Sequence, residues 1–146
     1  MTKQSKARIF LSLIVVFLIP GCTGALGVQE IRSREVGEIE TLLQAYEDAW
    51  NNHDQGKLLP LLDKEFIMWV WVGGERKLIL RKETYAFYLR DLLVKYRYVK
   101  FGEPTIWIKD DQGTASLSMS VDGRNVRGIF RLIRKQDKWL MLEWEF

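Results

Sequence analysis

The sequence predicts an α+β domain in which helices pack inside a strongly curved antiparallel sheet. Three observations carry this prediction. Apolar residues recur at helical spacing over residues 36–50, the second half of the chain reads as successive strands, and the elements follow the order ααββαββββ. With 146 residues, 47% of them hydrophobic, the chain is long enough for one domain with its own core.

The first predicted element is an amphipathic helix that ends near residue 51. Its apolar side chains recur at spacings of three and four: Val36, Ile39, Leu43, Tyr46 and Trp50. Ser33 is the expected N-cap, and the polar run at 51–54 ends the helix. Asp54 is expected to cap a second helix, which Pro60 keeps short because proline lacks a backbone donor.

Strands and one further helix follow. Residues 66–72 are apolar throughout, and Gly73-Gly74 predicts a hairpin turn into a return strand at 77–80. Residues 82–96 carry an apolar stripe at helical spacing. Four strands are then expected at 98–109, 114–121, 125–134 and 139–146, and Asp122-Gly123 is a strong hairpin signal between the second and third of them.

The N-terminus has the organisation of a signal peptide. Lys3, Lys6 and Arg8 precede eleven uncharged residues, 9–19, which is the length of a signal-peptide apolar region and too short to span a membrane. Residues 18–22 resemble a bacterial lipoprotein signal, which implies cleavage before Cys22 and a lipid on that residue. We therefore expect a signal at 1–21, a flexible tether at 22–33 and a domain at 34–146, anchored in the bacterial cell envelope outside the cytoplasm. The alternatives are an ordinary secretory signal and an uncleaved anchor.

Charge argues against a nucleic-acid partner. The formal net charge of +3 depends on the three basic residues of the signal. Without them, 19 basic residues balance 19 acidic ones, so the mature domain has no excess positive charge for phosphates. Cys22 is the single cysteine, which leaves no partner for a disulfide within the chain.

The phrase Tyr46, Ala49-Trp50-Asn51 and Asp54, together with the element order, resembles the nuclear-transport-factor-2-like superfamily. The similarity lies with the bacterial SnoaL-like and ketosteroid-isomerase-like branch and covers roughly residues 34–146. It implies a cystatin-like cone with a pocket at its open end, and frequently a dimer across the outer face of the sheet. Isomerases, cyclases, dehydratases, epoxide hydrolases and non-catalytic binders share this fold, so the fold leaves the function open.

The resemblance gives Tyr46 the position of a tyrosine that donates a hydrogen bond to the substrate oxyanion. The general-base aspartate of the isomerases would fall within residues 68–71, which hold no carboxylate. Proton abstraction needs such a base beside the donor, so we do not expect ketosteroid-type isomerisation. A non-catalytic binding or interaction domain is favoured. The alternative is a SnoaL-like enzyme that acts on a small apolar substrate, with Tyr46 as donor and Glu143 or Asp91 as base, and a scaffold subunit is a third hypothesis.

The candidate pocket residues are aromatic and apolar side chains plus one possible ion pair: Tyr46, Trp50, Trp69, Trp71, Tyr85, Leu89, Trp107, Met119, Arg131 and Glu143. For the aromatic residues, core packing is the favoured alternative to lining a pocket. Arg131 and Glu143 are compatible with either a cross-strand ion pair on a solvated sheet or a polar site inside the cone.

The sequence also makes predictions about partners. The single histidine, His53, is expected in a turn facing solvent, although the adjacent carboxylate invites an acid–base interpretation. One histidine and scattered carboxylates do not suggest a metal, and we expect no cofactor. Trp69 and Trp71 share a strand face with Ile67, and both faces of this strand are apolar. One face must cover the helices, so the other would be exposed in a monomer. We therefore expect a homodimer or another protein contact there. A small apolar ligand and the membrane, reached through Cys22, complete the expected partners.

Overall fold

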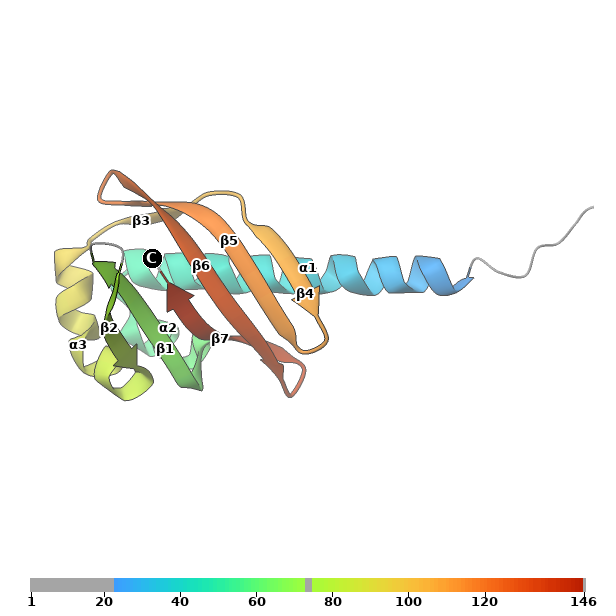
Figure 1. Ribbon diagram of the computed structural model, residues 1–146, viewed down its shortest axis with the longest axis horizontal. Coiled ribbons are helices and arrows are strands. Elements are labelled where there is room, and N and C mark those ends of the chain that lie inside the picture. Colours follow the sequence, from blue (N-terminus) through green and yellow to red (C-terminus); the bar gives the residue numbers. More distant parts are fainter. Residues whose placement is uncertain (1–22, 73–74, 146) are drawn as a thin grey trace, which may run out of the picture.

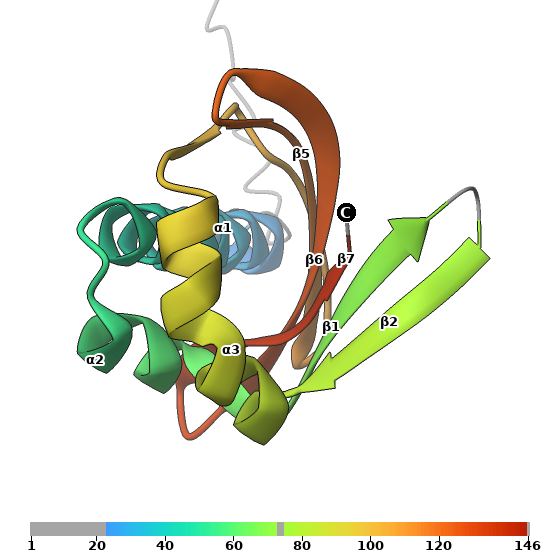
Figure 2. The same cartoon turned by 90° about the vertical axis from the view of Figure 1, so that its left-hand side faces the viewer.

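A curved sheet wraps around one side of a helical layer (Figures 1 and 2). The computed structural model describes residues 23–72 and 75–145. Its strands are β1 (Leu62–Val72), β2 (Glu75–Arg81), β3 (Val99–Phe101), β4 (Thr105–Lys109), β5 (Gln112–Val121), β6 (Arg124–Lys135) and β7 (Lys138–Glu145). They form one seven-stranded sheet in the order β2-β1-β7-β6-β5-β3, with β4 also paired to β5. The predicted α+β class is therefore confirmed, with one pair, β1–β7, parallel rather than antiparallel.

The helices cover the concave face of the sheet, whereas the β1–β2 hairpin projects away from them (Figure 2). They are α1 (Thr23–Asn51), α2 (Gln55–Leu58), which continues into a 3-10 turn at Leu59–Leu61, and α3 (Lys82–Lys95). As predicted, Asp54 caps α2, because its carboxylate accepts a hydrogen bond from the Lys57 backbone N–H. Pro60 lies in the 3-10 turn that ends this short segment.

The core lies between α1 and the inner face of the sheet. Tyr46 and Trp50, from the end of α1, pack against Phe130 of β6 and Trp144 of β7, and all four side chains are at most 3% exposed. The Phe130 and Trp144 rings stack with centroids 5.6 Å apart, and Trp144 meets Trp50 edge to face at 5.9 Å. Such aromatic contacts add to the hydrophobic stabilisation that burial itself provides.

The single strand predicted over 98–109 is wrong in one respect, because it is two strands. β3 ends at Phe101 and β4 begins at Thr105, with Gly102, Glu103 and Pro104 between them. Pro104 has no N–H to donate to a ladder, and Gly102 lies so close to β5 that a Cβ there would collide with the Ser118 hydroxyl. Both strands still pair with β5, so the break bends the sheet edge without removing it.

The helix α1 also begins earlier than the sequence predicts. We expected Ser33 as its N-cap and a flexible tether over 22–33, but the described residues are helical from Thr23 onward. These first turns project beyond the sheet (Figure 1), so the segment reaches away from the domain as a regular helix. The predicted signal at 1–21 and Cys22 lie outside the described residues. Within the described part of the chain, no helix is both long and apolar enough to cross a membrane.

Candidate functional site

A cavity of about 460 Å³ opens where the end of α1, the last turn of α3 and the β5–β6 hairpin meet. This volume lies within the range of small-molecule sites. Trp50 and Trp144 form part of its wall, and most of the other lining residues are apolar. Its lining residues are Trp50, Met68, Leu92, Lys95, Tyr96, Val99, Val121, Asp122, Arg124, Val126 and Trp144.

The shape of this cavity depends on polar contacts made by the end of α1. The Trp50 indole N–H donates to the Tyr96 carbonyl at 2.7 Å, which ties the end of α3 to α1. Asn51 binds the Val99 backbone twice, since its Nδ2 donates to the carbonyl at 2.8 Å and its Oδ1 accepts from the N–H at 2.9 Å. The Asn51 side chain therefore pairs with β3 as a neighbouring strand would.

Tyr46 does not reach the cavity. Its side chain is 0% exposed, and its hydroxyl lies 2.7 Å from the hydroxyl of Tyr85, which is also fully buried. Burial raises the pKa of Tyr46 well above its usual value, and the adjacent Tyr85 raises it further. Burial likewise raises the pKa of Tyr85. Both phenols therefore stay neutral and share one hydrogen bond inside the core.

Nine of the ten candidate pocket residues have described side chains, and of these the structure brings Trp50 to the cavity and places the other eight elsewhere. Tyr46, Tyr85, Leu89 and Met119 are core residues. Trp107 is 56% exposed on β4, and Trp69 is half-buried on β1. The side chain of Trp71 lies outside the described residues.

Arg131 and Glu143 do not form a polar site inside the cone. They face each other across β6 and β7 and form an ion pair. Their neighbours Phe130, Leu132 and Trp144 point into the core, so the pair lies on the outer face of the sheet. Asp91, the other candidate base, is exposed on α3. Neither carboxylate is therefore beside the Tyr46 hydroxyl.

The structure can be compared with known proteins. No protein-family model and no curated protein sequence matches the chain. Solved structures do match it. An NTF2-like protein with a cystatin-like fold from Novosphingobium aromaticivorans superposes with a TM-score of 0.68 at 17% identity, over 84% of this chain and 87% of that one. An NTF2-like protein of unknown function from Shewanella baltica gives 0.66 at 13%, over 77% and 92%.

The chain has the NTF2-like, cystatin-like fold. A candidate dehydratase of the NTF2-like family from Streptomyces avermitilis matches with a TM-score of 0.61 at 12% identity, over 77% of this chain and 95% of that one. At such identities the likeness concerns the fold alone. The activity of this NTF2-like domain therefore has to be argued from its own site.

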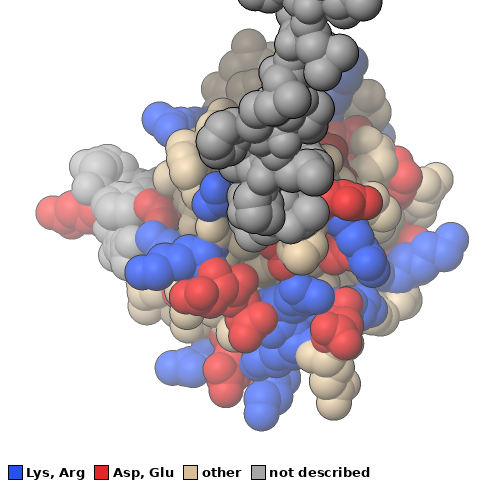
Figure 3. Space-filling model, turned by 90° about the vertical axis from the view of Figure 1, so that its right-hand side faces the viewer, with Lys and Arg blue, Asp and Glu red and all other residues tan. Residues whose placement is uncertain are grey.

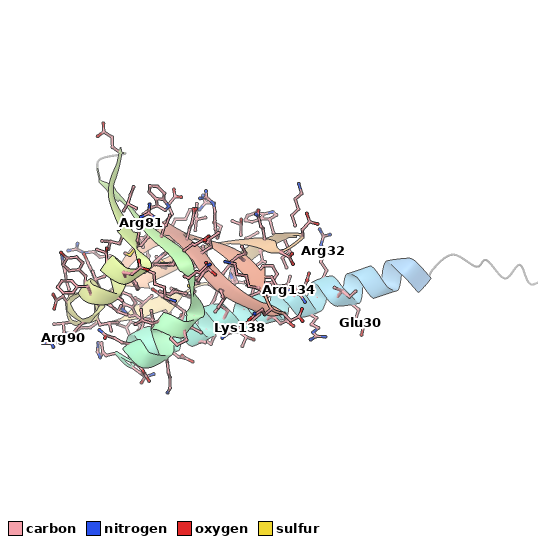
Figure 4. All side chains as sticks on the ribbon, turned by 90° about the horizontal axis from the view of Figure 1, so that it is seen from below. Glu30, Arg32, Arg81, Arg90, Arg134 and Lys138 are labelled. Carbon is pink, nitrogen blue, oxygen red and sulfur yellow. The ribbon has the colours of Figure 1, made fainter. Side chains whose placement is uncertain are left out.

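His53 lies in the turn that this NTF2-like domain makes after α1. Its φ angle of +54° ends the helix in the left-handed region, and its backbone N–H donates to the Trp50 carbonyl at 2.9 Å. The side chain is exposed beside a second hollow that also contains Arg90 and Arg97. Arg90 lies at the end of the molecule opposite Glu30 and Arg32 (Figure 4). No group of three potential metal-binding side chains occurs among the described residues.

Sequence reasoning missed most of the cavity wall of this NTF2-like domain. The sequence predicts Leu92 and Tyr96 as part of the apolar stripe of the 82–96 helix and Asp122 as a turn residue, whereas all three line the cavity. What these residues share is a place at the end of a helix or strand. Because a cone opens where its elements end, the last turn of each predicted helix and the two residues on either side of each predicted strand boundary are the available signal.

Proposed function

We propose that this chain is a lipid-anchored protein of the bacterial cell envelope whose NTF2-like domain binds a small apolar molecule without catalysing a reaction. The observation that carries the binding function is the cavity itself. Aromatic and aliphatic side chains dominate its wall, and the indole of Trp50, whose N–H is occupied by the Tyr96 carbonyl, presents only apolar surface to a ligand. A concave apolar wall of this kind favours transfer of an apolar molecule from water.

The arrangement of polar groups supports binding over catalysis. An acid–base reaction needs a donor and a base that both reach the substrate. The Tyr46 hydroxyl is paired with Tyr85 away from the cavity. Among the described residues of the wall, Asp122 is the acidic one, and its Oδ1 already accepts a hydrogen bond from the Tyr98 N–H at 3.0 Å. The alternative of a SnoaL-like enzyme with Tyr46 as its donor is therefore disfavoured.

Filling the cavity should weaken binding. We expect Leu92→Trp, which places a larger side chain in the wall, to weaken binding of 2-(1-naphthyl)ethanol by at least about tenfold, because ligand and indole compete for one volume. Titration calorimetry of the full-length chain in lipid nanodiscs, with empty nanodiscs as the blank, measures this affinity. The matched control is Val94→Trp, since Val94 is 64% exposed on the same helix and lies outside the cavity. If Leu92→Trp binds the probe as tightly as the parent chain, the cavity is not the binding site.

The anchor is a separate prediction. Cys22 is the single cysteine, so any thioester- or thioether-linked lipid has one possible position. We expect the parent chain to incorporate a palmitate analogue in cells and to sediment with membranes, whereas Cys22→Ser does neither. Thr23→Ser, the adjacent conservative change, should behave as the parent chain. Lipid incorporation into the Cys22→Ser variant would contradict the proposed anchor.

The helix α1 would separate the cavity from the proposed anchor. From Thr23, the residue that follows Cys22 in the sequence, to Trp50 at the cavity, this helix is about 40 Å long. Figure 3 views the molecule from the end where α1 leaves the sheet, and basic and acidic side chains are interspersed there. A mixed surface of this kind attracts anionic lipids weakly, which is consistent with attachment through a lipid rather than through charge.

We also propose that a second copy of this chain covers the outer face of the sheet. Large apolar side chains lie on that face, including Trp107 on β4 and Ile79 on β2, which are 56% and 53% exposed. Native mass spectrometry should therefore detect a dimer of the detergent-extracted chain, and Ile129→Arg, in the middle of that face, should convert it to a monomer. Val94→Arg on α3 is the control. A parent chain that remains monomeric at high concentration would rule out this dimer.

A further inference from the structure

The cavity wall contains two basic side chains whose charges are not neutralised by ion pairs with described residues. They are Lys95, in the last turn of α3, and Arg124, the first residue of β6. The two elements that carry them meet at the cavity. Both side chains are exposed, as expected of groups at an opening rather than in the apolar interior.

Asp122, the acidic residue of the same wall, is already engaged. Its carboxylate accepts a hydrogen bond from the Tyr98 N–H, and its own N–H donates to the Tyr98 carbonyl at 2.9 Å. These bonds fasten the β5–β6 hairpin to the segment between α3 and β3. Asp122 therefore supplies one negative charge against two positive charges, and its hydrogen-bonding role is a structural one.

The ammonium group of Lys95 has a defined position. Its Nζ lies 5.2 Å from the centroid of the Tyr96 ring, within the range of a cation–π contact. Tyr96 also lines the cavity, so this contact keeps the charge beside the apolar wall. The contact with the Tyr96 ring uses none of the ammonium N–H groups in a conventional hydrogen bond, so these donors can still bind an anionic group.

One feature of this end of α3 opposes an anion. The C-terminus of a helix carries partial negative charge on its last carbonyls. The carbonyl of Tyr96, at the C-cap, accepts the Trp50 indole N–H and is thereby partly neutralised. An anionic group at the opening therefore needs both cations, whereas a cationic group would meet repulsion from them.

From this arrangement we infer that the ligand is an apolar molecule that carries one anionic group, with its apolar body against Trp50 and Trp144 and its anion held by Lys95 and Arg124. This inference rests on the proposed binding function and specifies the class of ligand.

Three probes with the same ring system test the inference: 1-naphthaleneacetate, 2-(1-naphthyl)ethanol and 2-(1-naphthyl)ethylammonium. Their affinities for the full-length chain are measured by titration calorimetry in nanodiscs of uncharged lipid headgroups. We expect the carboxylate to bind about tenfold more tightly than the alcohol, because only the anion forms hydrogen bonds in which both partners are charged, and the ammonium to bind most weakly.

The double variant Lys95→Gln/Arg124→Gln should remove the preference for the anion, so that the carboxylate no longer binds more tightly than the alcohol. Lys100→Gln/Arg127→Gln is the matched control, because both residues are exposed cations outside the cavity wall. If carboxylate and alcohol bind equally to the parent chain, or if the double variant keeps the preference, the inferred ligand class is wrong and the binding function stands. If neither probe binds, the proposed function itself is wrong.

Discussion

The Asn51→Ala variant is expected to lose about 2–3 kcal/mol of unfolding free energy, because its side chain makes two hydrogen bonds that nothing else can replace. Nδ2 and Oδ1 of Asn51 pair with the carbonyl and N–H of Val99, and Val99 is only 1% exposed. Alanine leaves both backbone groups without partners in a largely dry environment. Urea unfolding of the full-length chain, followed by tryptophan fluorescence, measures the difference.

Two further variants make this prediction specific. Asn52→Ala removes the adjacent, exposed side chain, whose Nδ2 donates to the Asp48 carbonyl, and it should cost less than about 0.5 kcal/mol. Asn51→Asp keeps the acceptor for the Val99 N–H but sets a carboxylate oxygen against the Val99 carbonyl at the C-terminus of α1, so it should also destabilise the chain. If Asn51→Ala and Asn52→Ala unfold at the same urea concentration, the pairing with β3 contributes nothing.

The same variant connects stability to binding. Val99 lines the cavity, and β3 is held in place by Asn51 on one side and by β5 on the other. Loosening β3 should therefore weaken binding of the naphthyl alcohol as well as stability. The residues that resemble the superfamily, from Tyr46 to Asp54, therefore have mainly structural roles. Trp50 and Asn51 attach α3 and β3 to α1, and Asp54 caps α2.

The element order and fold class could be predicted because they depend on local signals. Apolar spacing along α1, alternation in β5 and the Asp122-Gly123 turn each reflect a few neighbouring residues. The depth of each aromatic side chain depends on the sheet instead. Tyr46 and Trp50 lie one turn apart on the same stripe and are both buried, but of the two Trp50 alone also lines the cavity, because α3 and the sheet leave space beside the end of α1.

The face occupied by Glu143 was not predictable for a related reason. Along β7 the inward residues are Trp139, Met141 and Trp144, so the alternation skips one position. The skip accompanies a register shift in the β6–β7 pairing, where consecutive residues Arg131 and Leu132 oppose Glu143 and Met141 and leave Leu142 of β7 as the extra residue. A bulge of this kind reverses which residues face outward. Since Leu140 and Leu142 are apolar too, nothing in the sequence of β7 marks the reversal.

The second large effect concerns Asp63, the one buried charged residue of the described core, which is 2% exposed at the start of β1. Its Oδ2 lies 2.9 Å from the Lys135 ammonium of β6, and its Oδ1 accepts the Glu65 N–H at 2.9 Å. Burial alone would raise the pKa of Asp63, but these hydrogen bonds and the nearby positive charge outweigh it and hold the pKa below its usual value.

The direction of this shift fixes how stability depends on pH. Because the folded-state pKa is lower than the unfolded-state value of about 3.9, the ionised carboxylate stabilises the fold at every pH above that value. The contribution is lost as the pH falls through the lowered folded-state pKa. We therefore expect the parent chain to lose stability below about pH 4, and Asp63→Asn to lack that part of the pH dependence.

At neutral pH, Asp63→Asn should cost about 2–3 kcal/mol, near the low end for breaking a buried ion pair, because Lys135 is 37% exposed and can be rehydrated. Lys135→Gln leaves the buried carboxylate without its cation, so it should destabilise the chain and raise the pKa of Asp63. Asp91→Asn, at an exposed position on α3, is the control. Urea unfolding from pH 3 to pH 7 separates the outcomes: parallel stability profiles for the parent and Asp63→Asn would mean that this carboxylate does not couple folding to protonation.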